Sequence, residues 1–317
     1  MSYSSSLASA ATELPSVSIV LPTWQGEADL RRLLPALAAQ RYNAPVEIVA
    51  FDSSSRDGSV ERLREFGARV TIIAQSDFGH GKTRNRAVEF ARHDIIVFLS
   101  QDALPQSESW LSALVAPLGD DKIGATFARQ IARPQAQALE RFALEYLYPP
   151  RSRRTRASRS APPLHKLFFS NVCSAARREV CLRFPFDETL IMSEDQFFAR
   201  DLLMGELDIF YNARAVVEHS HGYDLPTHFR RHFDSGASLH ALNGGGVAAS
   251  AARALHFVSH ETLYLLRRQQ WRALAWLPLH EAARFSALLL GGQAQRMPRS
   301  LAKKCSLHRA FWENYRQ

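Results

Sequence analysis

The sequence has few cysteines and no long apolar run. Cys173, Cys181 and Cys305 are odd in number and follow no metal-ligand spacing, which argues against a disulfide framework and a structural zinc site. No apolar stretch approaches the roughly 20 residues that a membrane-spanning helix needs. Residues 1–15 lack a basic segment followed by an apolar core, so they are predicted to form a disordered leader rather than a secretion signal. A reducing cytosol fits these absences.

A phosphate loop of the nucleotide-hydrolase type is also missing. Gly79, Gly81, Lys82 and Thr83 lie close together, but they do not have the GxxxxGK[ST] spacing. The sequence contains no internal repeat either. A nucleotide hydrolase and a repeat protein are therefore not indicated.

The composition indicates an enzyme-sized protein with a basic surface. Its 317 residues are 46% hydrophobic, enough for one large core or for a domain with an appended subdomain. The formal net charge is +8. This charge favours a polyanionic partner, which can be nucleic acid, anionic lipid or a diphosphate-bearing substrate. Charge alone does not choose among the three.

Short apolar runs alternate with helical patterns over the first hundred residues. The runs VSIVLP, EIVAF, RVTII and IIVFLS are β-branched and short, and amphipathic segments with leucine or valine at helical spacing separate them. This alternation predicts an α/β fold with a mostly parallel sheet covered by helices on both faces. Asp52 and Asp102 each follow a strand, at the edge where such sheets bind ligands.

The pattern changes after about residue 120. ATFARQIARP is predicted to be a strand and QALERFALEYLYPP an amphipathic helix. Residues 149–163 hold five arginines between proline pairs and are predicted to be a mobile basic loop, either solvated or facing a polyanion. SEDQFFARDLLMGE is predicted to be a helix opened by Ser193, and AVVEHSHG the end of a strand.

Two structural parts follow from these patterns, residues 16–223 as the α/β domain and residues 224–317 as a helical C-terminal extension. The extension interleaves aromatic residues with arginines, as in YLLRRQQWRALAWL. Such helices suit the face of an anionic bilayer. The alternative is a helical subdomain packed on the sheet whose arginines are only solvated.

Three groups of side chains are candidates for chemistry, and each also has a structural interpretation. Asp102 alone is a turn former or cap, and Glu194 with Asp195 is a favourable helix N-terminus. His219 and His221 lie on one face if the strand continues through them, because side chains repeat every two residues. Histidines at a strand end are either structural or metal ligands.

The order of these residues resembles a known family. Strand-end Asp52, strand-end Asp102 and the later Glu194-Asp195 pair are similar to family 2 of the inverting nucleotide-sugar glycosyltransferases, which have the GT-A fold. FGHGKTRN at 78–85, FLSQDA at 98–103 and EHSH at 218–221 resemble bacterial rhamnosyltransferases of surface polysaccharide assembly. So does the tail with Ser306-Leu307-His308 and Phe311-Trp312.

The resemblance implies a role for each matching position. Asp195 would be the catalytic base, with Glu194 beside it, and Asp102 would hold a Mg or Mn ion. The shared face of the two histidines near this site favours His219 as a further metal ligand, with His221 in reserve. The donor would contact Thr23, Glu27, Asp52, His80, Arg84 and Gln101, of which the first three border the nucleoside. Ser100 replaces the first acid of the usual Asp-X-Asp motif. No Gln-X-X-Arg-Trp motif follows the base, which argues against a processive synthase.

The resemblance also implies the reaction. The expected activity is transfer of L-rhamnose from dTDP-rhamnose to a lipid-linked or growing saccharide, with another nucleotide sugar as the alternative donor. We expect a cytoplasmic protein, peripheral on the inner face of the cell membrane. A basic nucleic-acid-binding protein is the alternative of a different class. The arginines follow no helix-turn-helix, RRM or finger pattern, so nucleic acid is not expected as a partner.

Overall fold

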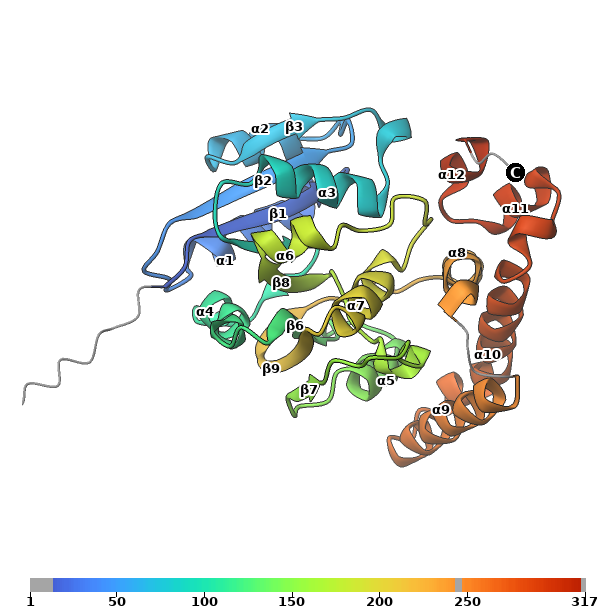
Figure 1. Ribbon diagram of the computed structural model, residues 1–317. Coiled ribbons are helices and arrows are strands. Elements are labelled where there is room, and N and C mark those ends of the chain that lie inside the picture. Colours follow the sequence, from blue (N-terminus) through green and yellow to red (C-terminus); the bar gives the residue numbers. More distant parts are fainter. Residues whose placement is uncertain (1–13, 243–246, 315–317) are drawn as a thin grey trace, which may run out of the picture.

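The computed structural model describes residues 14–242 and 247–314, and it consists of an α/β domain followed by a group of helices (Figure 1). Residues 1–13 of the predicted leader lie outside the described residues. The chain alternates between strands and helices up to about residue 115, as the apolar pattern predicts. The predicted α/β fold class is therefore confirmed.

The described strands form one nine-stranded sheet in the order β3-β2-β1-β4-β8-β6-β9-β5, with β7 paired to β9. Strands β1, β2, β3, β4, β6 and β9 run in the same direction, and β5, β7 and β8 run against them. The sheet is thus mostly parallel. Its strands are β1 (Val17–Thr23), β2 (Val46–Asp52), β3 (Arg69–Ile72), β4 (Ile95–Leu99), β5 (Leu104–Pro105), β6 (Ile123–Ile131), β7 (Arg153–Thr155), β8 (Cys173–Arg177) and β9 (Asp208–Glu218).

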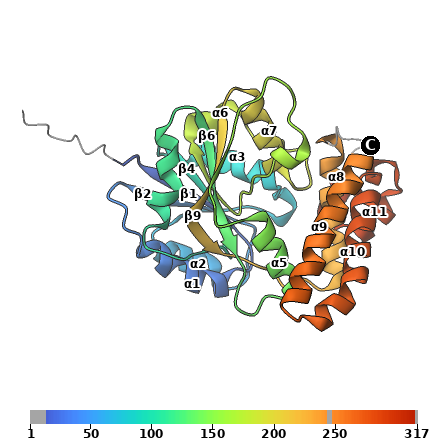
Figure 2. The same ribbon diagram turned by 90° about the horizontal axis from the view of Figure 1, so that it is seen from below.

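Helices cover both faces of the sheet, because side chains of buried strands alternate between two apolar faces. Ile19 and Val97 face a cluster that includes α1, α2 and α4, whereas Val20 and Phe98 face α3, α6 and α7. Figure 2 shows α1 and α2 on one side of the sheet and α6 and α7 on the other. These helices are α1 (Glu27–Ala38), α2 (Ser59–Glu65), α3 (His80–Phe90), α4 (Trp110–Val115), α6 (Arg178–Arg183) and α7 (Glu194–Met204).

The sheet topology brings the candidate residues to one edge. Thr23 and Asp52 are paired at the carboxyl ends of β1 and β2. Asp102 follows β4, and His219 follows β9 directly. Since β1, β2, β4 and β9 run in the same direction, these side chains lie at the same edge of the sheet.

The predicted basic loop contains a short strand that the sequence analysis did not anticipate. Arg153–Thr155 form β7, which pairs antiparallel with the first half of β9. Arg154 supplies the reason, since its guanidinium binds Asp208 at 2.5 Å and Asp120 at 2.6 Å. β7 pairs with the first half of β9, whereas His219 follows the last residue of β9. This part of the basic loop therefore lies at the other end of β9 and does not cover the candidate site.

Helix α7 forms where predicted, but Ser193 does not cap it as expected. Ser193 has left-handed backbone dihedrals, with φ 62, and its side chain makes no capping hydrogen bond to the described residues. The Gln196 N–H bonds the Ser193 carbonyl and also Asp195 Oδ1 at 2.9 Å. The first turn of α7 therefore orients the Asp195 side chain through the hydrogen bond from the Gln196 N–H.

The C-terminal helices pack on one another and on α5 (Ala138–Leu147), beside the α/β domain (Figure 2). Gly236 and Gly291 allow α8 and α10 to cross closely, because a Cβ at Gly291 would collide with the Phe233 carbonyl. Within residues 14–242 and 247–314, no helix is both long and apolar enough to span a membrane. The main helices are α8 (Leu225–Leu239), α9 (Val247–Arg267), α10 (Trp271–Gly291), α11 (Arg299–Cys305) and α12 (Arg309–Asn314).

Candidate active site

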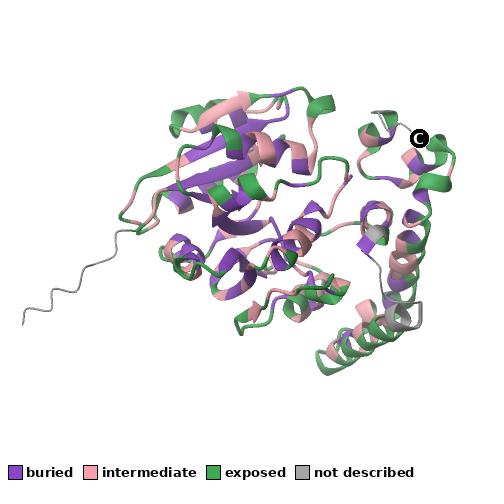
Figure 3. Cartoon of the chain, viewed as in Figure 1, coloured by how far each residue is buried: buried purple, intermediate pink, exposed green. Residues whose placement is uncertain are grey.

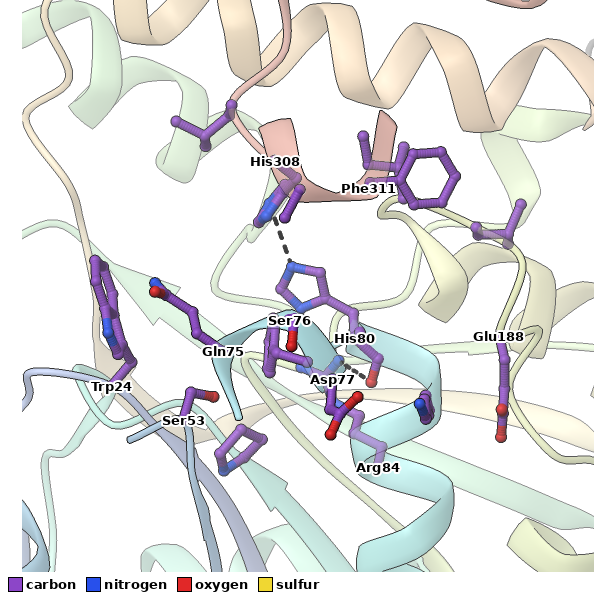
Figure 4. A pocket seen from close by; sticks show the side chains of 18 of the residues that line it. Trp24, Ser53, Gln75, Ser76, Asp77, His80, Arg84, Glu188, His308 and Phe311 are labelled. Atoms are coloured by element: carbon purple, nitrogen blue, oxygen red, sulfur yellow. Dashed lines mark hydrogen bonds between the residues drawn. The ribbon is translucent and has the colours of Figure 1, made fainter. Parts of the chain in front are cut away.

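A cavity of about 1290 Å³ opens at the carboxyl edge of the sheet (Figure 4). It runs from the ends of β1 and β2 to the start of α3 and the loop after β4, and we call it the first cavity. Its lining is residues 22–24, 53, 75–80, 82, 84, 100–102, 188–191 and 307–311. The cavity therefore includes Thr23, His80, Arg84, Gln101 and Asp102 of the predicted site.

Asp52 supports the wall of the first cavity from behind. Its carboxylate is fully buried and accepts hydrogen bonds from Thr23 Oγ1 at 2.8 Å and from the Ser55 amide and hydroxyl at 2.7 Å each. Thr23 and Ser53 line the cavity, whereas Asp52 does not. The nucleobase contact of Asp52 remains a prediction, and its structural role is to hold the loop that follows β2.

We expect Asp52→Ala to weaken binding of dTDP, the nucleotide that the resemblance implies, by about tenfold, because Thr23 and Ser55 lose their shared acceptor and a charge-assisted hydrogen bond contributes about 1.5–3 kcal/mol. Titration of the protein with dTDP measures the effect. Ser55→Ala is the matched control, since it removes one of the three hydrogen bonds and should cost less affinity. Unchanged dTDP affinity in Asp52→Ala would remove this residue from the site.

Of the two predicted donor-binding residues Glu27 and Gln101, Gln101 lines the first cavity and Glu27 does not. The hydrogen bond from Arg31, followed by that from Arg62, lowers the pKa of Glu27, and Glu27 is not among the described residues that line the first cavity. Gln101 does line it, and its side-chain amide exchanges two hydrogen bonds with the Trp24 backbone at 2.9 and 3.0 Å. Gln101 thus ties the loop after β4 to the loop after β1.

Asp102, His219 and His221 come together as the sequence predicts. The Asp102 Oδ2 lies 3.5 Å from His219 Nε2 and 3.5 Å from His221 Nδ1. One ligand atom from each residue falls within 4.8 Å of the others, which is the spacing of a metal site. Burial raises the pKa of Asp102, but the hydrogen bond and charge of His219, with the charge of His221, outweigh it and hold that pKa below its ordinary range.

Neighbouring side chains fix the orientation of both histidines. His219 Nδ1 lies 2.9 Å from Gln130 Oε1, a contact that directs Nε2 toward Asp102. The His221 ring stacks on Tyr223, with centroids 4.6 Å apart. Gln130 was not predicted because it lies 89 residues from His219 in the chain, and Tyr223 was not predicted because no motif marked it.

Asp195 and Glu194 begin α7 on the other side of the site. Arg84 Nη1 donates to Glu194 Oε1 at 2.5 Å, and both side chains are buried. Asp195 Oδ2 accepts a hydrogen bond from the backbone N–H of Asn171 at 3.4 Å. Burial, followed by the charge of Glu194, raises the pKa of Asp195 to about 7, although Arg84 acts in the opposite direction. A carboxyl with this pKa exchanges protons near neutral pH.

A second cavity of about 930 Å³ adjoins the first. It contains Glu194, Asp195, His219 and His221, and its outer wall is formed by α5, α8, α9 and α10. The C-terminal extension therefore belongs to the site. Residues shared by both cavities are His80, Arg84, Ser100, Asp102, Leu307 and His308.

Comparison with known proteins assigns the class. The sequence model of Glycosyl transferase family 2 matches residues 18–183. A mannosyltransferase from Pyrobaculum calidifontis, solved in complex with GDP-Man and Mn²⁺, has a TM-score of 0.55 and 19% identity over 95% of this chain and 86% of its own. This likeness shows the fold. The chain belongs to glycosyl transferase family 2, and it is a glycosyltransferase with the GT-A fold.

Two relatives match nearly the whole chain. The O-antigen chain rhamnosyltransferase WbaN of Salmonella anatum is 30% identical over 314 residues, which cover 95% of this chain and 97% of the relative. The O-antigen chain rhamnosyltransferase RfbN of Salmonella typhimurium is 30% identical over 311 residues, or 94% and 96% of the two chains. The resemblance stated from the motifs is thereby confirmed, and the enzyme interpretation prevails over the nucleic-acid-binding one.

Proposed function

We propose that this protein is an inverting glycosyltransferase that moves L-rhamnose from dTDP-rhamnose to a lipid-linked or growing saccharide. The observation that carries this proposal is the placement of Asp195 in the same cavity as Asp102, His219 and His221. The rhamnosyl specificity is supported by the two O-antigen chain relatives.

In the proposed reaction, the acceptor hydroxyl attacks the anomeric carbon from the side opposite to the diphosphate. The new C–O bond forms as the bond between the anomeric carbon and the diphosphate oxygen breaks, and Asp195 takes the hydroxyl proton. The electron pair of the broken bond leaves with the diphosphate. Glu194 forms an ion pair with Arg84. Its negative charge also raises the pKa of Asp195, so that this carboxylate can accept the proton.

The residues present fit a divalent cation. Asp102 offers a carboxylate oxygen, and His219 offers Nε2 because Gln130 occupies its Nδ1. We propose Mn²⁺ or Mg²⁺, which carboxylate and phosphate oxygens suit, and Mn²⁺ is the ion present in the Pyrobaculum calidifontis mannosyltransferase. A bound cation would supply positive charge for the diphosphate leaving group. Ser100 in place of a second acid is tolerated because the histidines complete the ligand set.

The two cavities divide the substrates between them. The first cavity reaches Thr23 and Ser53 at the sheet edge and would hold the nucleotide, and the second would hold the acceptor beside Asp195. Incubation with a panel of dTDP, UDP and GDP sugars, with release of free nucleotide as the readout, tests the assignment. We expect dTDP release from dTDP-rhamnose to be fastest. Faster release from a UDP or GDP sugar would overturn the donor assignment.

A membrane surface is the partner that a lipid-linked acceptor requires, and we propose that the outer face of α9 and α10 contacts it. Trp271 and Trp276 are 62% and 58% exposed, and Leu289 is 74% exposed. At 100° per residue, these side chains lie within an arc of about 140° on α10. Figure 3 shows the exposed residues along both helices. Arg267 and Arg272 flank the turn between these helices.

We expect the wild-type protein to sediment with anionic liposomes at low ionic strength and to be released by salt, since each cation near the surface contributes about 1 kcal/mol. Trp271→Ala combined with Trp276→Ala should leave most of the protein in the supernatant. Phe90→Ala, which changes an exposed aromatic on α3, is the control. Wild-type protein that stays wholly in the supernatant would refute membrane contact, while the glycosyltransferase assignment would stand.

A further inference from the structure

A segment from the far end of the chain completes the first cavity. Leu307 and His308 connect α11 to α12, Arg309–Phe311 begin α12, and all five residues line the cavity together with the loops of the α/β domain. Figure 4 shows His308 and Phe311 on the side of the cavity opposite Ser53 and Asp77. The nucleotide-binding region is thus built from both parts of the chain.

Buried contacts hold this segment in place. Asp234 on α8 is fully buried, and its Oδ2 accepts the backbone N–H groups of Leu307 at 2.9 Å and His308 at 3.1 Å. Trp312 is buried next to Phe233, with ring centroids 6.3 Å apart. The position of His308 is therefore set by the core of the helical extension.

His308 meets His80 inside the cavity. The two Nε2 atoms lie 3.4 Å apart, and the rings meet edge to face with centroids 5.0 Å apart (Figure 4). His80 is the first residue of α3, an 11-residue helix whose first turn carries Lys82 and no acid. Arg84, one turn further, is more than nine-tenths buried, and its Nε has no hydrogen-bond partner among the described residues. The two imidazoles and Lys82 offer donors to an anion, whereas Arg84 is already paired with Glu194.

The place of the pair indicates which part of the substrate it meets. His80, Arg84, Asp102 and His308 border both cavities, so they surround the passage from the nucleotide side to the acceptor side. In a nucleotide sugar, the diphosphate joins the nucleoside to the transferred sugar. The bond that breaks must lie at this passage, with the diphosphate on its nucleotide side.

We propose that His308, together with His80, binds the donor diphosphate, so that residues 307–311 form part of the donor-binding site. This inference rests on the proposed use of a nucleoside diphosphate sugar. It assigns His308 a contact with the leaving group, whereas Asp195 acts on the acceptor. On donor binding, a phosphate oxygen would replace the contact between the two Nε2 atoms and accept an imidazole N–H instead.

The test compares dTDP with dTMP in binding titrations of wild type, His308→Ala and His308→Gln. We expect His308→Ala to weaken dTDP binding by at least about tenfold and dTMP binding by less than about threefold, since dTMP lacks the second phosphate. His308→Gln, which keeps an N–H donor, should recover part of the dTDP affinity. Lys304→Ala on the exposed side of α11 is the control and should match wild type.

Unchanged dTDP affinity in His308→Ala would overturn the proposal, and so would an equal loss for dTDP and dTMP. The affinities of the wild-type protein for dTDP, UDP and GDP test the donor assignment separately. If wild type prefers UDP or GDP to dTDP, the thymidine assignment fails, and the same comparison is made between that diphosphate and its monophosphate. A rise of donor KM larger than the fall of kcat in His308→Ala would further support a binding role.

Discussion

Asp195→Asn is expected to lower kcat by about 10³-fold while dTDP affinity changes by less than about twofold. Asparagine keeps the volume of aspartate but cannot accept the proton that the acceptor hydroxyl loses during attack, and general-base catalysis contributes about 10²–10⁴-fold. Initial rates with dTDP-rhamnose and a dTDP titration on the same preparation separate the two quantities. Asp201→Asn, on the same helix, is the control for a change of charge on α7.

The pH dependence of the wild-type rate provides an independent check on Asp195. The base acts in its ionised form, and its pKa is raised to about 7. The rate should therefore fall about tenfold per pH unit below pH 7 and level off above it. Asp195→Asn should lose this dependence. Equal losses of donor affinity and rate in Asp195→Asn would instead mark the residue as a donor contact.

Asp102→Asn is expected to reduce transfer by at least about 100-fold and to abolish the effect of Mn²⁺ on dTDP binding. The substitution removes the carboxylate of the Asp102, His219 and His221 group, and charge stabilisation by a bound cation contributes several kcal/mol. Titration of the protein with dTDP, once in the presence of Mn²⁺ and once in the presence of EDTA, measures how far the cation strengthens dTDP binding. Wild type should bind dTDP more tightly with Mn²⁺.

The control for Asp102→Asn is Asp121→Asn, which changes an exposed carboxylate before β6. This variant should behave as wild type in both titrations. If Asp102→Asn turns over normally and EDTA leaves the wild type active, the metal role of Asp102 is wrong. Mn²⁺-dependent dTDP binding that survives in Asp102→Asn would lead to the same conclusion.

Local patterns predicted the architecture because they reflect local physics. Short apolar runs separated by helical segments predicted β1, β2 and β4. Because these strands are parallel, Asp52 and Asp102 lie at the same edge of the sheet. His219 and His221 both lie 3.5 Å from Asp102, as predicted, although β9 ends at Glu218 and the strand does not continue through them. These inferences needed only short stretches of sequence.

Long-range contacts account for what the sequence did not reveal. The strand β7 forms because Arg154 binds Asp208 and Asp120, neither of which is near it in the chain. His308 reaches His80 across 228 residues, and the buried side chains of Asp234 and Trp312 hold the segment that carries it. The similarity of Ser306-Leu307-His308 to rhamnosyltransferases was the signal that could have identified the tail as part of the site.

The most direct test of the central claim is an NMR measurement of the anomeric configuration of the product. The protein is incubated with dTDP-rhamnose, Mn²⁺ and a set of alkyl glycosides as acceptors, and the one-bond C–H coupling at the rhamnose anomeric carbon is followed. A single displacement assisted by Asp195 predicts that the donor signal is lost and a rhamnoside of the opposite anomeric configuration appears. A product that retains the donor configuration would contradict this mechanism.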